Sequence, residues 1–158
     1  SGVPVVSGTT GWIDRISEVN KLCKNKNGAF LYASNFSLAV NIFFELNSKL
    51  ANLMKGYNNY TSEIHETHHT DKLDAPSGTA KKLCNQMDLI LKKKTTITYE
   101  RIVDAVGIHT VNYKSPVDEI EIKHASKNRD GFAIGAIMAA EWIKDKKGIF
   151  SMKDVLYK

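Results

Sequence analysis

Three of the five histidines lie within one short run of the sequence, at positions 65, 68 and 69, and Lys72 follows them. An imidazole exchanges a proton near neutral pH, and a lysine ammonium can donate a proton or pair with an anion. Directly afterwards, Pro76-Ser77-Gly78-Thr79 has the form of a helix start, whose free backbone N–H groups bind carboxylates and phosphates. The run therefore indicates acid/base chemistry on a small anionic ligand.

The same three histidines are also candidates for metal ligands. On a helix, His65, His68 and His69 would gather on one face and leave an open position for water, as in zinc sites. The β-branched residues around them and the approach to Pro76 favour a strand instead, on which His65 and His68 point to opposite faces. We therefore expect no metal here, and a zinc protein built on this histidine cluster is the alternative.

A second candidate region is the turn Gly8-Thr9-Thr10-Gly11. It follows the apolar run Val3–Ser7, and ligands of α/β proteins bind outside the carboxyl ends of such strands. The turn has neither the G-x-G-x-x-G spacing of dinucleotide-binding proteins nor the Gly-Lys-Ser/Thr of a P-loop. A ligand-binding turn and a purely structural turn are both compatible with this sequence.

The elements that would position these residues begin with a βαβ unit. Val3–Ser7 predicts a strand, and apolar residues at helical spacing from Ile13 to Leu22 predict a helix. Ala29–Ala33 is a short, continuous apolar run, which is typical of a strand buried on both faces of a parallel sheet. A helix follows, because apolar residues recur at positions 38, 42, 46, 50 and 53.

The rest of the chain predicts an inserted α+β lobe and a helical return. Ala80–Lys93 predicts a helix, and Phe132–Lys147 predicts a second one, apolar enough to be expected well buried. Between and before them, four β-rich segments predict a four-stranded mixed or antiparallel sheet: Tyr60–Thr67, Thr95–Glu100, Ile108–Tyr113 and Glu119–His124. The predicted class is α/β, with a partial Rossmann-like βαβ remnant and this inserted lobe.

Composition and charge narrow the function classes. The chain has 158 residues and a net charge of +5, which comes from 19 Lys and 3 Arg. Nucleic-acid recognition relies on arginine forks, so we expect no nucleic-acid partner. The longest apolar stretch, Phe132–Ile143, has about 12 residues where a membrane helix needs about 20, so we expect no membrane partner. Cys23 and Cys84 form no Cys-x-x-Cys pair, which fits a reducing cytoplasm.

One run of fifteen residues is specific enough to point to a family. Residues 66–80, Glu-Thr-His-His-Thr-Asp-Lys-Leu-Asp-Ala-Pro-Ser-Gly-Thr-Ala, closely resemble the signature E-x-H-H-x-x-K-x-D-A-P-S-G-T-A. This signature is that of the dihydrodipicolinate (4-hydroxy-tetrahydrodipicolinate) reductases of lysine and diaminopimelate biosynthesis. Shorter segments support the resemblance in the same order along the chain: 8–12, 33–37, 106–110 and 128–136.

The resemblance implies a reductase that uses NADPH or NADH to reduce a small cyclic dicarboxylate. It implies that His68 is the acid/base residue and that Lys72 is the proton donor. The residues that it implies for the substrate carboxylates are His69, Gly78 and Thr79. Those that it implies for the nicotinamide end of the cofactor are Gly8, Thr9, Thr10, Ala33, Ser34, Asn35 and Phe36.

The resemblance also implies three segments of the chain with different functions. Residues 1–36 would close a dinucleotide-binding domain, residues 37–126 would bind substrate and form the oligomer, and residues 127–158 would return to the first domain. In this family four subunits assemble through the inserted sheet, so we expect a homotetramer and an exposed apolar face on that sheet.

The beginning of the sequence departs from the family. The family starts with strand–G-x-x-G-x-M-G–helix, the turn that seats the cofactor pyrophosphate, and no such run occurs here. We expect about two or three βαβ units to be missing upstream and the chain to be inactive by itself. A non-catalytic oligomerisation fragment is the alternative.

Overall fold

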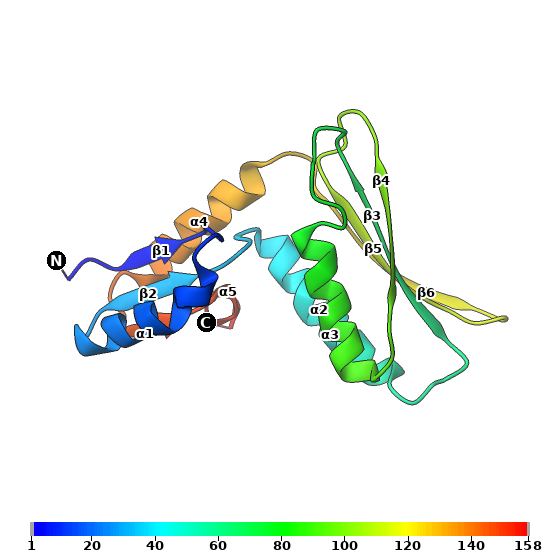
Figure 1. Cartoon of the computed structure of the whole chain (residues 1–158), viewed down its shortest axis with the longest axis horizontal. Coiled ribbons are helices and arrows are strands. Elements are labelled where there is room, and N and C mark those ends of the chain that lie inside the picture. Colours follow the sequence, from blue (N-terminus) through cyan, green and yellow to red (C-terminus); the bar gives the residue numbers. More distant parts are fainter. Residues whose placement is uncertain (1, 158) are drawn as a thin grey trace. The chain divides into compact units, whose positions relative to one another are not determined.

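The computed structural model describes residues 2–157, and Figure 1 shows the order of their strands and helices. The strands are β1 (Val5–Ser7), β2 (Ala29–Tyr32), β3 (Thr61–His68), β4 (Thr96–Arg101), β5 (Ile108–Lys114), β6 (Glu119–Ala125) and β7 (Gly148–Phe150). The helices are α1 (Ile16–Asn25), α2 (Leu38–Met54), α3 (Gly78–Leu91), α4 (Asp130–Ile143) and α5 (Met152–Leu156), and a 3-10 turn, η1 (Ile13–Arg15), precedes α1. The α/β class is confirmed.

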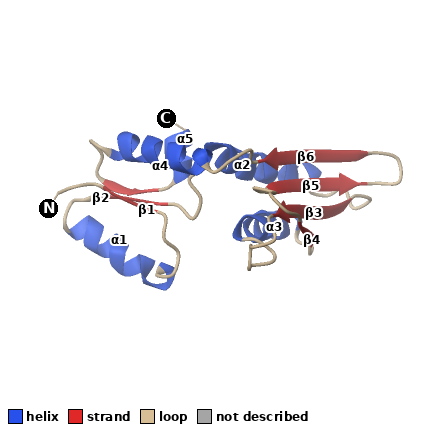
Figure 2. Ribbon diagram, turned by 90° about the horizontal axis from the view of Figure 1, so that it is seen from above, coloured by secondary structure: helices blue, strands red, loops and turns tan. Residues whose placement is uncertain are grey.

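A small parallel sheet forms the first part of the fold. Its strand order is β1-β2-β7, so the expected βαβ unit is present. The central strand β2 is buried on both faces, as its continuous apolar run predicts, and Leu31 is fully buried. Figure 2 shows α1 on one face of this sheet and α4 with α5 on the other. The core on the α4 side includes Leu31, Ala139, Ile143, Met152 and Val155.

Two features of this part differ from the sequence predictions. The sequence does not predict β7, because a strand of three residues shows too little alternation to be recognised. The closing helix ends at Ile143 and is less buried than its apolar sequence suggests, since Ile134 and Ile137 are 56% and 59% exposed. The buried residues of α4 are Gly135, Ala139 and Ile143, which lie on one side of the helix.

A four-stranded mixed sheet forms the second part, which confirms the prediction. The strand order is β4-β3-β5-β6, with β3 parallel to β4 and antiparallel to β5. α2 and α3 lie on one side of this sheet (Figure 1), and Ile64 and Val111 are fully buried. Asn47 of α2 donates a hydrogen bond to the carbonyl oxygen of Leu83 in α3 at 3.1 Å, so the two helices pack together.

The uncovered face of the four-stranded sheet is polar, which corrects the expected apolar face. Strand alternation places Glu63 and His65 of β3 on this face together with Asn112 and Lys114 of β5. Lys114 Nζ lies 3.5 Å from Glu63 Oε2. The apolar residues of these strands occupy the helix-covered face instead, because residues two apart share one face.

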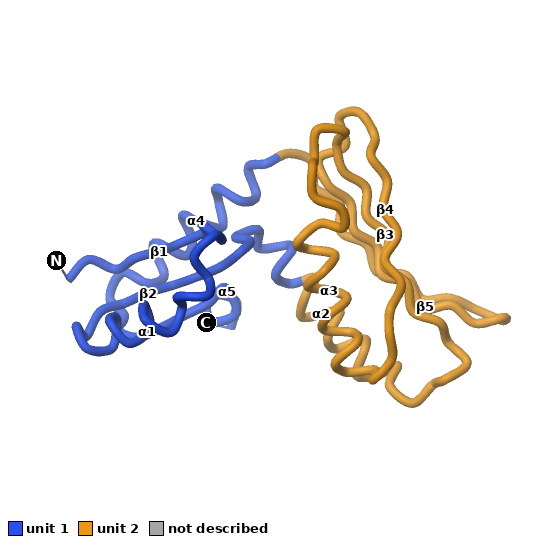
Figure 3. The backbone as a smooth tube through the Cα atoms, in the orientation of Figure 1, with its two compact units in different colours: residues 1–42, 129–158 blue, residues 43–128 orange. Residues whose placement is uncertain are grey.

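The chain divides into two compact units, shown in different colours in Figure 3. Unit 1 comprises residues 1–42 and 129–158, and unit 2 comprises residues 43–128. The sequence places these boundaries after residues 36 and 126, whereas the structural division falls inside α2 and directly before α4. No helix among the described residues is long and apolar enough to cross a lipid bilayer.

Candidate active site

The chemically active residues of unit 2 gather where β3 ends and α3 begins. His68 is the last residue of β3, and the loop 69–77 leads from it to α3. Strand alternation places Glu66 and His68 on the same face of β3, and both are less than a tenth exposed. His65 faces the other way, with its Nδ1 2.9 Å from Thr98 Oγ1. The prediction that His65 and His68 point to opposite faces of a strand is therefore correct.

Glu66 is the centre of a buried charge cluster and is itself fully buried. Its Oε1 accepts the backbone N–H of Ser77 at 2.9 Å and lies 3.3 Å from Nη2 of Arg101. Its Oε2 lies 3.4 Å from Nδ1 of His68 and 3.5 Å from Nε2 of His109. One carboxylate thus joins the ends of β3, β4 and β5 to the start of α3.

The surroundings keep Glu66 ionised and His68 neutral near pH 7. Burial raises the pKa of Glu66, but hydrogen bonds from His109 and Ser77 and the nearby His68 act against it and lower that pKa to about 2. Burial lowers the pKa of His68 to about 4, although the charge of Glu66 opposes this shift. The cluster therefore places a neutral imidazole against a buried anion.

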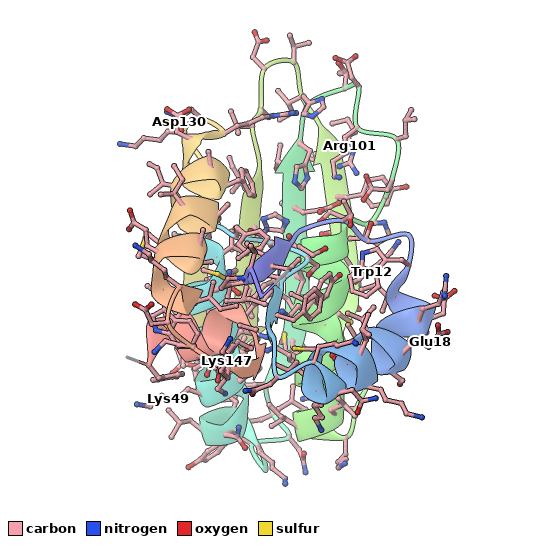
Figure 4. All side chains as sticks on the ribbon, turned by 90° about the vertical axis from the view of Figure 1, so that its left-hand side faces the viewer. Trp12, Glu18, Lys49, Arg101, Asp130 and Lys147 are labelled. Carbon is pink, nitrogen blue, oxygen red and sulfur yellow. The ribbon has the colours of Figure 1, made fainter. Side chains whose placement is uncertain are left out.

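Lys72 brings a positive charge into the loop that follows His68. Its Nζ lies 2.5 Å from Oδ1 of Asp74, and this hydrogen bond lowers the pKa of the Asp74 carboxyl. The Lys72 ammonium is also close enough to His68 for its charge to help lower the pKa of that imidazole. Arg101, labelled in Figure 4, donates from Nη2 to the carbonyl oxygen of Asp74 at 2.8 Å. The loop that carries Lys72 is therefore anchored to β4.

The start of α3 supplies backbone donors next to this cluster. Ser77 is the N-cap, because its Oγ accepts the N–H of Ala80 at 3.1 Å. Gly78 is exposed, with no atom within 4 Å of the place where a Cβ would stand, and Thr79 is half-buried. Since Ser77 also donates to Glu66, Gly78 and Thr79 lie within two residues of the cluster. His69 is half-buried, and its carbonyl oxygen accepts the N–H of Lys72 at 3.2 Å.

The residues expected at the cofactor lie in unit 1, in the two loops that follow β1 and β2. These strands are parallel, and the N–H of Ala33 donates to the carbonyl oxygen of Ser7 at 3.1 Å, so both loops leave the same edge of the sheet. A Cβ at Gly8 would lie 3.0 Å from a ring atom of Phe36. A side chain at position 8 would crowd this ring, so the glycine lets the first loop lie directly on the aromatic ring of the second.

The other members of these two loops offer hydroxyl and amide groups. Thr9 Oγ1 accepts a hydrogen bond from Nε1 of Trp12, which Figure 4 labels, at 2.9 Å. The Asn35 side chain accepts the N–H of Ser37 at 2.9 Å, which fixes the turn into α2. Thr10 and Ser34 are exposed. The structure thus brings the seven expected residues together at one sheet edge of unit 1.

Glu66, His68 and His109 form a set that could hold a metal ion, since one ligand atom from each lies within 4.8 Å of the others. Two imidazoles and a carboxylate are ligands that zinc accepts. Arg101 already brings a positive charge to 3.3 Å from the same carboxylate, which opposes a divalent cation there. This set also differs from the zinc alternative of the sequence, which needs His65, His68 and His69.

Three members of the cluster have no assigned role in the sequence prediction: Glu66, Arg101 and His109. Glu66 could have been found, because it stands two positions before His68 in a predicted strand and so shares its face. The other two come from distant segments. Only the pairing of His68 with Arg101 in β4 and of Glu66 with His109 in β5 brings them to the site.

Comparison with known protein families gives the site its context. Residues 39–156 match the family described as dihydrodipicolinate reductase, C-terminus. The chain belongs to this family. The resemblance seen in the sequence is therefore confirmed, and the matched range includes the whole cluster around Glu66.

Individual reductases give the same result over nearly the whole chain. The 4-hydroxy-tetrahydrodipicolinate reductase of Christiangramia forsetii (strain DSM 17595 / CGMCC 1.15422 / KT0803) is 50% identical over 166 residues, which cover 98% of this chain and 70% of that protein. That of Aquifex aeolicus (strain VF5) is 38% identical and covers 96% of this chain and 63% of its own length. That of Methanoregula boonei (strain DSM 21154 / JCM 14090 / 6A8) is 35% identical, with 99% and 66% covered.

A solved structure shares the fold. The dipicolinate-bound dihydrodipicolinate reductase from Paenisporosarcina sp. TG-14 superposes with a TM-score of 0.74 at 23% identity. The match covers 96% of this chain and 64% of that one. The chain thus spans about two thirds of the length of the reductases that it matches.

Proposed function

We propose that this chain acts as a cytoplasmic NAD(P)H-dependent 4-hydroxy-tetrahydrodipicolinate reductase of lysine and diaminopimelate biosynthesis. One observation carries the proposal: a neutral imidazole and the start of a helix adjoin the buried carboxylate of Glu66, and the ammonium of Lys72, paired with Asp74, lies close enough to act on the same imidazole. Together these groups match the two requirements of the reaction, which are to bind a cyclic dicarboxylate and to supply a proton.

The start of α3 is the proposed seat of the substrate carboxylates. The backbone N–H groups of Gly78 and Thr79 and the positive end of the α3 dipole favour an anion there, and His69 adds a polar side chain. Dipicolinate, which is bound in the solved relative, is a planar dicarboxylate with the same two charges. Lys72 would leave Asp74 in part and share its charge with the substrate.

The loops of unit 1 are the proposed seat of the nicotinamide. Gly8 packs on the ring of Phe36 at the carboxyl ends of two parallel strands, where α/β proteins bind their ligands. Thr9, Thr10, Ala33, Ser34 and Asn35 would complete this seat. The cofactor, when bound, supplies the hydride, and the proposal covers NADH and NADPH alike.

The proton is the part of the reaction that this chain's own side chains supply. Lys72 is a cationic donor, and its ammonium would donate to the substrate ring as charge develops there. His68 is neutral near pH 7, so its imidazole can accept a proton and pass it on. One hydride and one proton enter the substrate, and water leaves.

Turnover tests the proposal directly. The chain should be fused to the N-terminal region of the Christiangramia forsetii relative, and NADPH oxidation should be followed with 4-hydroxy-tetrahydrodipicolinate as substrate. His68→Ala and Lys72→Ala should each lower kcat by about 10² to 10⁴, the usual range for a lost acid or base. Lys94→Ala, an exposed change beyond the end of α3, should leave kcat unchanged. Equal kcat in all four proteins would refute the assigned roles.

The 158-residue chain should also be measured without the fusion. We propose that it binds the dicarboxylate but is inactive by itself, because its expected cofactor contacts are those at the nicotinamide end. Binding of pyridine-2,6-dicarboxylate without turnover would agree with this expectation. A chain that neither binds this ligand nor turns over would support the alternative, a non-catalytic oligomerisation fragment.

We further propose that the four-stranded sheet of unit 2 joins four copies of the chain. Its uncovered face carries Glu63, His65, Asn112 and Lys114, so the contact would be made largely by hydrogen bonds and ion pairs. Sedimentation equilibrium should then show a tetramer that weakens as the salt concentration rises. A monomer at low salt would contradict this assembly.

A further inference from the structure

The contact between Glu66 and His68 determines where the imidazole proton must lie. Oε2 of Glu66 and Nδ1 of His68 are 3.4 Å apart, and both atoms are enclosed. Within residues 2–157, neither atom has a hydrogen-bond partner, so their 3.4 Å contact is a buried contact between a carboxylate and an imidazole and not a formed hydrogen bond. Each of the two atoms therefore depends on this contact for electrostatic compensation.

A neutral imidazole has one N–H, on either Nδ1 or Nε2. If Nε2 carried the proton, the lone pair of Nδ1 would face a buried carboxylate oxygen, and two electron-rich atoms would meet without a proton between them. Such an uncompensated contact between buried polar atoms is unfavourable. If Nδ1 carries the proton, the positive N–H dipole lies beside the negative carboxylate and the contact becomes attractive.

We propose that Glu66 is a positioning residue that holds His68 with its proton on Nδ1, so that the lone pair of Nε2 is presented for proton transfer. The inference rests on the proposed function, because it gives His68 its acid/base state. Glu66 itself contacts neither substrate nor cofactor in this proposal. Its effect on the reaction is made through His68.

Other residues of the cluster hold the Glu66 carboxylate in place beside His68. The N–H of Ser77 and the guanidinium of Arg101 both address Oε1, which fixes the carboxylate and leaves Oε2 for the two rings. Nε2 of His109 lies 3.5 Å from Oε2 and 3.1 Å from Ser77 Oγ. The rings of His68 and His109 meet edge to face with their centroids 5.0 Å apart, so neither ring can turn freely.

The opposite edge of the His68 ring has space that a side chain would remove. A Cβ at Gly107 would lie 3.1 Å from Nε2 and 3.2 Å from Cδ2 of His68. The loop before β5 therefore passes the reactive edge of the ring with a residue that has no side chain. This arrangement agrees with an Nε2 that must exchange protons with another molecule.

Nitrogen NMR of the histidine rings tests this proposal without substrate or turnover. In ¹⁵N-histidine-labelled protein at pH 7, the His68 signals, assigned by their loss in His68→Asn, should show a protonated Nδ1 and an unprotonated Nε2. Glu66→Gln is the decisive variant. Its amide NH₂ can donate to Nδ1, so the proton should move to Nε2 and the two nitrogen shifts should exchange their order.

Glu63→Gln is the matched control, because Glu63 is on the same strand but on the opposite face, 3.5 Å from Lys114 Nζ. It should leave the His68 shifts unchanged. The proposal is wrong if wild-type His68 carries its proton on Nε2, or if folded Glu66→Gln keeps the wild-type order. Should Glu66→Gln not fold, the wild-type spectrum alone decides.

The NMR result for the His68 tautomer and the turnover result for the proposed function can be distinguished. If the protein is not a reductase, the tautomer of His68 can still be read and remains as stated. If it is a reductase with His68 in the Nε2–H form, turnover persists and only the role of Glu66 is lost. In the fusion protein, Glu66→Gln should lower kcat at least tenfold with little change in the KM for the dicarboxylate.

Discussion

Unit 1 and unit 2 prepare their proposed sites by different physical means. In unit 2, the site is built around a fully buried carboxylate with charged and polar partners on four elements. In unit 1, the two loops proposed for the cofactor are positioned by a packed aromatic ring and by short-range hydrogen bonds such as that from Ser37 to Asn35. All five histidines belong to unit 2 and none to unit 1.

The difference follows from what each site is expected to bind. A proton transfer needs side chains whose charge states are set, and a buried network sets them. A flat ring held at a sheet edge needs backbone at the correct place, which glycines and packing supply. The contrast leads to predictions that separate the two units.

The largest expected effect is the loss of the central carboxylate of unit 2. Glu66→Ala would leave the partly buried Arg101 without its anion and the N–H of Ser77 without its acceptor. The free energy of unfolding, measured in urea, should fall by about 3 kcal/mol. Glu63→Ala, which removes a partly exposed ion pair, should lower it by less than about 1 kcal/mol. Equal losses of unfolding free energy in the two variants would show that the buried cluster contributes no more to stability than the partly exposed ion pair.

A second change should affect unit 1 alone. In Gly135→Ala the new Cβ would stand 1.8 Å from the carbonyl oxygen of Phe36, so α4 or the loop 33–36 must shift. Such overpacking lowers the free energy of unfolding by about 2 kcal/mol. In Gly131→Ala the new Cβ would meet only Ser37 Oγ at 3.7 Å, an ordinary contact, so this control should be close to wild type. Binding of pyridine-2,6-dicarboxylate to unit 2 should persist in both variants.

Acid should weaken unit 2 through His68. The pKa of His68 is about 4 in the folded chain and about 6.5 when unfolded, so below pH 6.5 the unfolded state binds the proton first. The contribution of His68 to the free energy of unfolding is complete above pH 6.5 and is lost as the pH falls toward 4. Between pH 6.5 and 5 the free energy of unfolding should fall by about 1.5 kcal/mol. Urea unfolding of His68→Asn should lack this component. The pKa of Glu66 is lowered to about 2 in the folded chain, so the free energy of unfolding falls further as the pH falls from 4.5 to 2.

The sequence predicted much of the unit 2 site because its residues are close together in the chain. His68, Lys72 and the helix start at Ser77 lie within ten positions, so one loop necessarily gathers them. Arg101 and His109 could not be predicted, because their positions depend on the register of β4 and β5 against β3. Nothing in a single strand states its register with another.

The fold could likewise be predicted only where it does not depend on contacts between distant segments. The continuous run of β2 and the helical spacing in α2 gave both elements correctly. The polar outer face of the large sheet could not be read in advance, since it depends on which face the helices cover. The exposed side of α4, with Ile134 and Ile137, likewise depends on which neighbours the helix has.

The central claim is that unit 2 holds a dicarboxylate at the start of α3. Titration of pyridine-2,6-dicarboxylate into ¹⁵N-labelled protein, followed by amide NMR, tests it most directly. The account predicts that the amide signals of His69, Gly78 and Thr79 shift together, and that Lys72→Ala weakens binding by about tenfold or more, the loss expected for one charged hydrogen bond. Lys94→Ala should bind as wild type does. Shifts confined to unit 1, or no binding at millimolar ligand, would contradict the account.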